Sequence, residues 1–150
     1  MTTNLETMLN YFTQIRRYYA NELNKRLKDI NLSPNEISIL ILLSNNHFIT
    51  TSSQLVVLLG VSKGLISRSI DALVKKELIE CKRDSEDKRV VHLYLTDKAD
   101  EVSKVLQLEI EKINTEILDA IPEERIKIME ETMIDIANAF KSKNDESEFK

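Results

Sequence analysis

Two arginines flank a short charged stretch in the middle of this chain, and guanidinium groups at such positions are suited to binding nucleic acid. Arg83 and Arg89 enclose the sequence Asp84-Ser85-Glu86-Asp87-Lys88, and the neighbouring runs 79–83 and 89–96 favour β-structure. A hairpin would place both arginines at the shoulders of its loop. There a guanidinium can enter a narrow, electronegative minor groove of DNA, and a nearby carboxylate can hold it in a forked hydrogen-bonded pose. The alternative is an ordinary solvated loop.

The segment before this hairpin has the pattern of a helix that can approach DNA. Ser62 is a suitable N-cap, and apolar residues at helical spacing supply one face to the core, namely Ile66, Ile70, Leu73 and Val74. The other face carries Lys63, Gly64, Ser67, Arg68, Asp71 and Lys75. Small residues let a helix backbone enter a major groove about 12 Å wide while Ser, Lys and Arg reach phosphates and base edges. Alone, this face could simply be solvated, but the adjoining basic hairpin favours DNA contact.

Capping signals predict the elements that position this helix. Residues 33–36 (Ser-Pro-Asn-Glu) and 51–54 (Thr-Ser-Ser-Gln) each fit a capping box, and Gly60 can end the short helix that the second box begins. Two short helices joined by a tight turn make a helix-turn-helix, which adds Ser52 to the predicted DNA contacts.

Long amphipathic helices are expected at both ends of the chain. Apolar residues keep a helical rhythm over about 5–30 and 97–141, and the polar residues 142–150 predict a frayed tail. The fold class is therefore mainly α (α+β), a winged helix-turn-helix over about 33–96 with a two-stranded β wing. The apolar faces of the terminal helices exceed what one such unit can cover, which favours a helical homodimer interface over a taller monomer.

Charge is distributed unevenly along the sequence. The net charge of −4 divides into +1 for residues 1–60 (5 basic, 4 acidic), +2 for 61–96 (8 and 6) and −7 for 97–150 (8 and 15). A weakly basic segment (residues 61–96) joined to an acidic one (residues 97–150) can bind DNA on one side of the protein. There is no apolar run long enough to cross a membrane and no secretory signal, which predicts a cytoplasmic protein.

The order of elements and the hairpin sequence resemble the MarR family of transcriptional regulators over nearly the whole chain. The segment Arg83-Asp84-Ser85-Glu86-Asp87-Lys88-Arg89, followed by Leu93-Tyr94-Leu95-Thr96, is similar to that family's wing pattern R-D-x-x-D-x-R and L-x-L-T. Val61-Ser62 and Ile66-Ser67-Arg68 resemble its recognition helix.

The resemblance implies a single MarR-like domain over 1–150 that binds a pseudo-palindromic operator in double-stranded DNA as a homodimer. It implies that the recognition helix enters the major groove and that Arg89, steadied by Asp87, enters the minor groove. The predicted DNA contacts are Ser52, Ser62, Lys63, Gly64, Leu65, Ser67, Arg68, Arg83, Asp87, Lys88 and Arg89. Three residues depart from the family pattern. Glu77 and Ala99 replace common glycines, and Leu65, where a small hydroxyl residue is frequent, can touch a thymine methyl or turn inward.

Ligand sensing is less well specified by the sequence. The resemblance implies a small-molecule effector bound between the dimer helices and the winged core, where Tyr11, Phe12, Tyr18 and Tyr19 can line a pocket or form plain core. No metal site or other cofactor is predicted, because His47 and His92 lie on different elements and metal-ligand clusters are missing. The one cysteine, Cys81, is expected to be a half-buried small hydrophobe.

The leading hypothesis is a dimeric, sequence-specific transcriptional regulator, a repressor rather than an activator in the first instance, whose DNA binding a small ligand can relieve. The second is a winged-helix architectural or protein-interaction module without operator specificity. An enzyme finds no support, because the sequence has no Gly-rich phosphate loop and no nucleophile with a plausible base.

Overall fold

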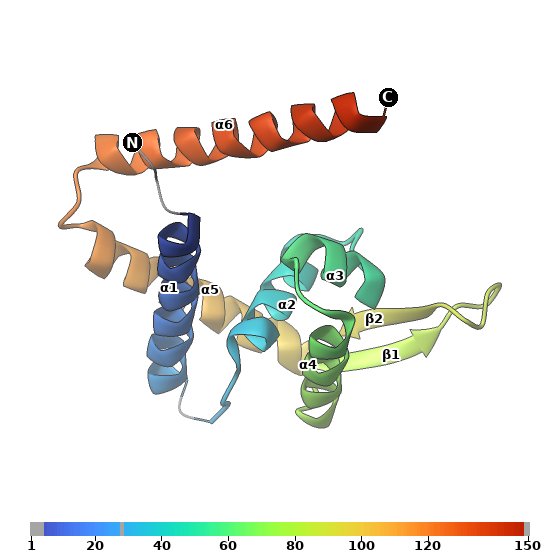
Figure 1. Ribbon diagram of the computed structural model, residues 1–150. Helices are drawn as coiled ribbons and strands as arrows, with labels where there is room; N and C mark the ends of the chain where they lie inside the picture. Colours follow the sequence, from blue (N-terminus) through green and yellow to red (C-terminus); the bar gives the residue numbers. More distant parts are fainter. Residues whose placement is uncertain (1–4, 28, 149–150) are drawn as a thin grey trace. The chain divides into compact units, whose positions relative to one another are not determined.

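The computed structural model describes residues 5–27 and 29–148. Its elements, in chain order, are α1 (Leu5–Arg26), α2 (Pro34–Asn45), α3 (Ser52–Leu59), α4 (Lys63–Lys75), β1 (Ile79–Arg83), β2 (Val91–Leu95), α5 (Asp97–Leu118) and α6 (Glu123–Glu148) (Figure 1). The chain divides into two compact units, residues 1–111 and 112–150, each of which is described by itself. The mainly helical fold with one β-hairpin confirms the predicted fold class.

The starts of three helices are set by side chains close in sequence. The hydroxyls of Ser33 and Ser62 accept the backbone N–H groups of Glu36 and Leu65, at 3.2 Å in both cases. Thr51 and Gln54 form a complete capping box at the start of α3. Because the first N–H groups of a helix have no partner within it, these side chains fix where each helix begins. Gly60, at φ 62°, ends α3 in the left-handed conformation that glycine adopts without strain.

The first capping box predicted from the sequence is only half formed, and the outcome for Glu36 differs from the prediction. Ser33 caps α2 as expected, but the carboxylate of Glu36 is buried and forms an ion pair with Lys76, beyond the end of α4. The same Lys76 ammonium donates to the carbonyl of Asn31 at 2.6 Å. A buried carboxylate requires a charged partner, and the partner here is 40 residues away.

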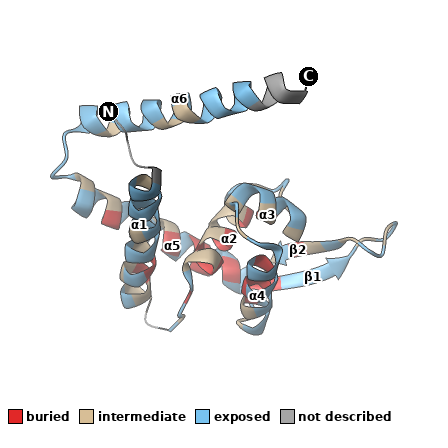
Figure 2. Cartoon of the chain, viewed as in Figure 1, coloured by how far each residue is buried: buried red, intermediate tan, exposed pale blue. Residues whose placement is uncertain are grey.

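The core of the first unit lies around α2, which buries Ile37, Ile39, Leu40 and Leu43 (Figure 2). Helix α2 contacts α1, α4 and β2. The side chains that are essentially inaccessible include Leu23, Ile39, Leu40, Leu55, Ile66, Leu73, Ile79 and Leu106. Burying each such side chain contributes about 1.5–3 kcal/mol. This core fixes α4 and the hairpin on one scaffold.

The two strands pair antiparallel, with Ile79 opposite Leu95 and Arg83 opposite Val91. Beyond the last pair, the Asp84 N–H donates to the Val90 carbonyl and the Val90 N–H to the Asp87 carbonyl, both at 2.9 Å. The second strand therefore begins at Val91, two residues later than the predicted run. The hairpin projects from the helical core, and its loop is the end farthest from α2 (Figure 1).

The terminal helices differ from the sequence prediction at their ends. The helix α1 stops at Arg26, earlier than the predicted end near residue 30. The helix α6 continues through Glu148, whereas a frayed tail was predicted from residue 142. The Ser142 hydroxyl, at the start of that segment, donates to the Asn138 carbonyl at 3.0 Å within the helix. Among the described residues, no helix combines the length and the apolar character needed to cross a bilayer.

Candidate nucleic-acid interface

The N-terminal turn of α4 presents a small polar surface. Ile66, Ser69, Ile70 and Leu73 face inward, and the Ser69 hydroxyl donates to the Leu65 carbonyl at 2.9 Å. The predicted contact residues of this helix are exposed, namely Ser62, Lys63, Gly64, Leu65, Ser67 and Arg68. Leu65 is 38% exposed, so of the two orientations considered for it the structure shows the outward one.

Gly64 lies in this first turn and has an ordinary helical backbone. A β-carbon built at Gly64 would meet no atom within 4 Å. Neither the packing nor the backbone of the chain therefore requires glycine at this position. Because Gly64 has no side chain, another molecule could approach the helix backbone closely at this position.

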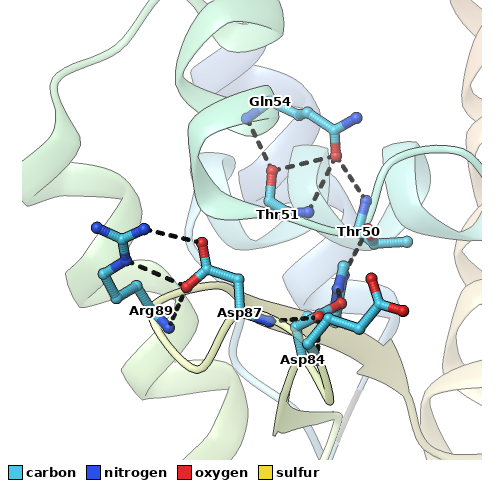
Figure 3. Close-up of polar contacts among 8 residues, drawn as sticks. Thr50, Thr51, Gln54, Asp84, Asp87 and Arg89 are labelled. Atoms are coloured by element: carbon cyan, nitrogen blue, oxygen red, sulfur yellow. Dashed lines mark hydrogen bonds and ion pairs between the residues drawn. The ribbon is translucent and has the colours of Figure 1, made fainter.

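The hairpin loop holds one arginine in a defined pose. The Asp87 carboxylate accepts from Arg89 through both oxygens, with Oδ1 3.1 Å from Nε and Oδ2 3.3 Å from Nη2, and Oδ1 also accepts the Arg89 backbone N–H at 3.0 Å (Figure 3). These hydrogen bonds hold the pKa of Asp87 below its usual value. The forked pose predicted for an arginine of this loop is confirmed. The Arg89 side chain is 91% exposed, so the pair orients the guanidinium without covering it.

The other basic residues of the loop are exposed as well. Arg83 reaches across the hairpin, where its Nη1 lies 3.5 Å from the Lys88 carbonyl, and Lys88 itself is exposed. Ser52 is the first residue of α3 and is half-buried. The structure thus groups the hairpin residues at the loop end of the hairpin and the α4 residues in the first two turns of that helix.

A polar group that sequence reasoning missed lies at the base of the loop. The His92 ring nitrogens contact the Thr50 hydroxyl and the Asp84 carboxylate, each at 2.9 Å. Asp84 also accepts the N–H groups of Glu86 and Asp87. These contacts, led by the Asp87 N–H and followed by those of His92 and Glu86, lower the pKa of Asp84 to about 2. Of His92, Thr50 and Asp84, only Asp84 had a local sequence signal, because aspartate commonly forms turns by accepting nearby backbone N–H groups.

The four aromatic residues predicted to line a ligand pocket are not brought together within one chain. Tyr11, Phe12 and Tyr18 on α1 are exposed. Tyr18 lines an open hollow of about 620 Å³ with polar neighbours, whereas Tyr19 lines a separate, mainly apolar hollow of about 170 Å³ between α1, α2 and Ile110.

Cys81 also differs from its prediction. It lies exposed on β1 with a free thiol, opposite Leu93 of β2. Partial burial, with a smaller contribution from Asp71, raises the pKa of this thiol and therefore favours the protonated form. In the part of the chain that the structure describes, no three His, Cys, Asp or Glu residues gather as metal ligands.

Comparison with known proteins gives consistent matches. A family model described as transcriptional regulator SarA/Rot matches residues 22–106. The "Uncharacterized HTH-type transcriptional regulator YpoP" of Bacillus subtilis is 37% identical over 103 residues, which cover 68% of this chain and 69% of that protein. The transcriptional regulator AdcR of Streptococcus pneumoniae is 37% identical over 71 residues, which cover 47% of each chain.

Solved structures show the same architecture. A SlyA-like transcription regulator from Listeria monocytogenes matches with a TM-score of 0.77 at 23% identity, over 93% of this chain and 90% of that one. A MarR family regulator from the same organism, complexed with a 26mer DNA, matches with a TM-score of 0.74 at 24% identity, over 87% of each chain. FabT of Streptococcus pneumoniae, in complex with DNA, matches with a TM-score of 0.65 at 26% identity, over 93% of this chain and 99% of that one.

Proposed function

This chain belongs to the SarA/Rot family of transcriptional regulators and has the MarR winged-helix fold, and we propose that it acts as a homodimeric repressor on a pseudo-palindromic operator. The observation that carries the proposal is the pose of Arg89. Its guanidinium is exposed and held by Asp87 at the end of a projecting hairpin, on the same scaffold as the exposed first turn of α4. Two neighbouring grooves of a duplex can accept a helix and such a hairpin together.

In this proposal the first turn of α4 lies in the major groove. The exposed N-terminal turn offers backbone N–H groups and the positive end of the helix dipole to a phosphate. Lys63 and Arg68 can reach phosphates or guanine edges, and the exposed Leu65 can contact a thymine methyl. Gly64 leaves room for the backbone to approach.

The loop of the hairpin lies in the adjacent minor groove. A narrow minor groove has an enhanced negative potential that attracts an inserted arginine. The fork with Asp87 restricts the guanidinium before binding, so less side-chain entropy is lost when it inserts. The carboxylate also offsets part of the positive charge, which favours one oriented contact over general attraction to phosphates.

The homodimer is supported by apolar side chains left exposed in both units. On α1, Tyr11, Ile15 and Tyr18 lie at i, i+4 and i+7 and share one exposed face. In the second unit, α6 exposes Ile128, Met129, Ile134 and Phe140. An exposed apolar face such as that of α1 marks an interface, and a two-fold dimer would present two copies of α4 and of the hairpin to two half-sites.

Release by a small effector is proposed for a site that a second protomer completes. The hollow beside Tyr19 measures about 170 Å³, below the roughly 300–1,000 Å³ of typical small-molecule sites. The exposed side chains of Tyr11, Phe12 and Tyr18 lie on the same helix, α1, that the dimer would cover. Dimerisation would therefore enclose the aromatic residues that one chain leaves apart.

The proposal is tested by measuring the affinity of purified variants for a duplex that the wild-type protein selects from a random-sequence library. Arg89→Ala should weaken binding by about 1–3 kcal/mol, and wild-type affinity should fall steeply with salt. Lys104→Ala is the matched control, because it removes one exposed positive charge from α5. Equal losses in the two variants would contradict the proposed minor-groove contact.

A second variant examines the other half of the interface. Gly64→Ala should fold normally, since its β-carbon meets nothing within 4 Å, and alanine should stabilise the helix by up to about 1 kcal/mol. Its affinity for the selected duplex should nevertheless fall. If wild-type protein bound a scrambled duplex as tightly as the selected one, the architectural alternative would replace sequence-specific repression.

A further inference from the structure

The hairpin loop is connected to the helix-turn-helix by a continuous series of polar contacts that passes through His92. On one side of the imidazole, Nδ1 lies 2.9 Å from the Thr50 hydroxyl; on the other, Nε2 lies 2.9 Å from Asp84 Oδ2. An ionised carboxylate can only accept, so Nε2 carries the hydrogen and Nδ1 of the neutral ring accepts from Thr50. One side chain therefore bonds to both elements.

Beyond Asp84 the series continues to the arginine proposed to enter the minor groove. Asp84 Oδ1 accepts the backbone N–H groups of Glu86 at 2.8 Å and Asp87 at 2.9 Å, which fixes the turn (Figure 3). This turn places the Asp87 carboxylate against the guanidinium of Arg89. A displacement of Asp84 would thus move the support of the Arg89 guanidinium.

At the opposite end, Thr50 is fixed to α3 and to β2. Its backbone N–H donates to Gln54 Oε1 at 2.9 Å, within the capping group of α3 (Figure 3). Its carbonyl accepts the Leu93 N–H at 2.7 Å. Gln54 Nε2 also donates to the Phe48 carbonyl at 3.1 Å. Thr50 is therefore a firm attachment point on the helix-turn-helix.

The hairpin alone offers little resistance to bending between its core end and its loop. It has five residue pairs, and only Ile79 and Leu93 are buried. A two-stranded hairpin without further packing is marginally stable in water. His92 is half-buried opposite Lys82, between the buried Leu93 on the core side and the exposed Val91 on the loop side.

We propose that His92 is a positioning residue for DNA binding, which ties the hairpin loop to the start of α3 so that Arg89 is held at a fixed place relative to α4. This inference rests on the proposed function, because it assigns His92 an effect that is exerted through Arg89. Without the tie, the loop must be ordered at the moment of binding. Such ordering costs about three- to tenfold in affinity for each group immobilised.

A double-mutant cycle on full-length protein tests this, with fluorescence anisotropy on the duplex selected by the wild-type protein as the readout. His92→Ala should weaken binding about three- to tenfold when Arg89 is present. In the Arg89→Ala background the same substitution should have an effect near onefold, since residues that act through one another are not additive. A purely structural role would weaken both backgrounds equally.

Two further variants separate the tie from general damage to the hairpin. Thr50→Val keeps the shape of the side chain and removes only the hydroxyl, so it should reproduce part of the loss with Arg89-dependence, even if His92→Ala fails to fold. His92→Gln retains an N–H donor toward Asp84 and should recover part of the affinity. Val91→Ala, the exposed neighbour on the same strand, is the control and should bind like wild type.

The outcomes are distinguishable. If Arg89→Ala weakens binding and His92→Ala either has no effect or adds fully to it, this inference is overturned while DNA binding by the winged helix stands. If Arg89→Ala itself leaves the affinity unchanged, the proposed minor-groove contact and the role of His92 are both overturned. Non-additive losses for His92→Ala and Thr50→Val, with normal binding by Val91→Ala, support the inference.

Discussion

Replacing Glu77 by glycine should make this protein more stable. Glu77 follows the C-terminal end of α4 and has φ 60°, a left-handed conformation that side chains disfavour. Its N–H donates to the Val74 carbonyl and the N–H of Leu78 to the Leu73 carbonyl, both at 2.9 Å. These two bonds form a Schellman ending, in which glycine is the usual residue at this position.

The expected gain follows from three contributions. The left-handed conformation costs an L-residue about 1–2 kcal/mol, which Glu77→Gly removes. Glycine has more freedom in the unfolded chain, which returns about 0.5–1 kcal/mol of that gain. The Glu77–Lys98 pair is lost, but it spans 3.8 Å with an 83% exposed carboxylate side chain, so its contribution is small. The net stabilisation is about 0.5–1 kcal/mol, or a rise of roughly 1–4 °C in Tm for a chain of this length.

Urea and thermal unfolding of both proteins at one protein concentration would measure the difference, since association of subunits adds to apparent stability. Glu77→Ala is the matched control, because it removes the same carboxylate but keeps a β-carbon at φ 60°. It should give no gain. If the alanine and glycine variants were equally stabilised, the carboxylate rather than the backbone conformation would be the source of the cost, and the reasoning would be refuted.

Two other substitutions test local energetics. Ser103 on α5 is 1% exposed, and its hydroxyl is the only one of the described buried side-chain polar atoms without a hydrogen-bond partner. Ser103→Ala should therefore leave the free energy of unfolding in urea unchanged or raise it by about 1 kcal/mol. A clear loss of stability would show that the hydroxyl has a partner. The pKa of Asp84 is lowered from 3.8 to about 2, so its contribution to stability is complete above pH 3.8 and is lost as the pH falls through 2. In Asp84→Asn the midpoint of urea unfolding should therefore depend less on pH in that window. An unchanged pH dependence of the midpoint would contradict the assignment.

The sequence was sufficient where the controlling residues are neighbours. Ser62 marked the start of α4 because an N-cap bonds to an N–H three residues ahead, and the same holds for Thr51 and Gln54 at α3. The Asp87–Arg89 fork was predictable because the two residues are separated by one position in a tight loop. The resemblance to MarR regulators is confirmed by the matching family model and folds.

The sequence was insufficient where a distant group decides the outcome. The apolar rhythm of α1 continues to Leu27, yet the helix ends at Arg26, and the Asn24 amide pairs with both backbone groups of Leu32 at 2.6 and 2.8 Å. Glu36 fits a capping box by its position, but a lysine brought close by folding takes its carboxylate. His92 alternates like any strand residue, and nothing local indicates that Thr50 lies beside it.

The two ends of α4 show why its exposed first turn was easier to predict than the contacts that support the helix. At the N-terminal end, the cap is local and the surrounding residues are exposed, so the surface proposed to contact DNA consists of consecutive residues. At the C-terminal end, Lys98 donates to the Lys76 carbonyl at 3.0 Å, Thr96 donates to the Glu77 carbonyl at 2.7 Å, and Lys76 reaches Glu36 of α2. The first turn of α5 and the first turn of α2 therefore both hold the end of α4 that faces away from its capped first turn. Because a rigid helix transmits displacement along its length, a shift of either support would move the exposed first turn without altering any residue in it.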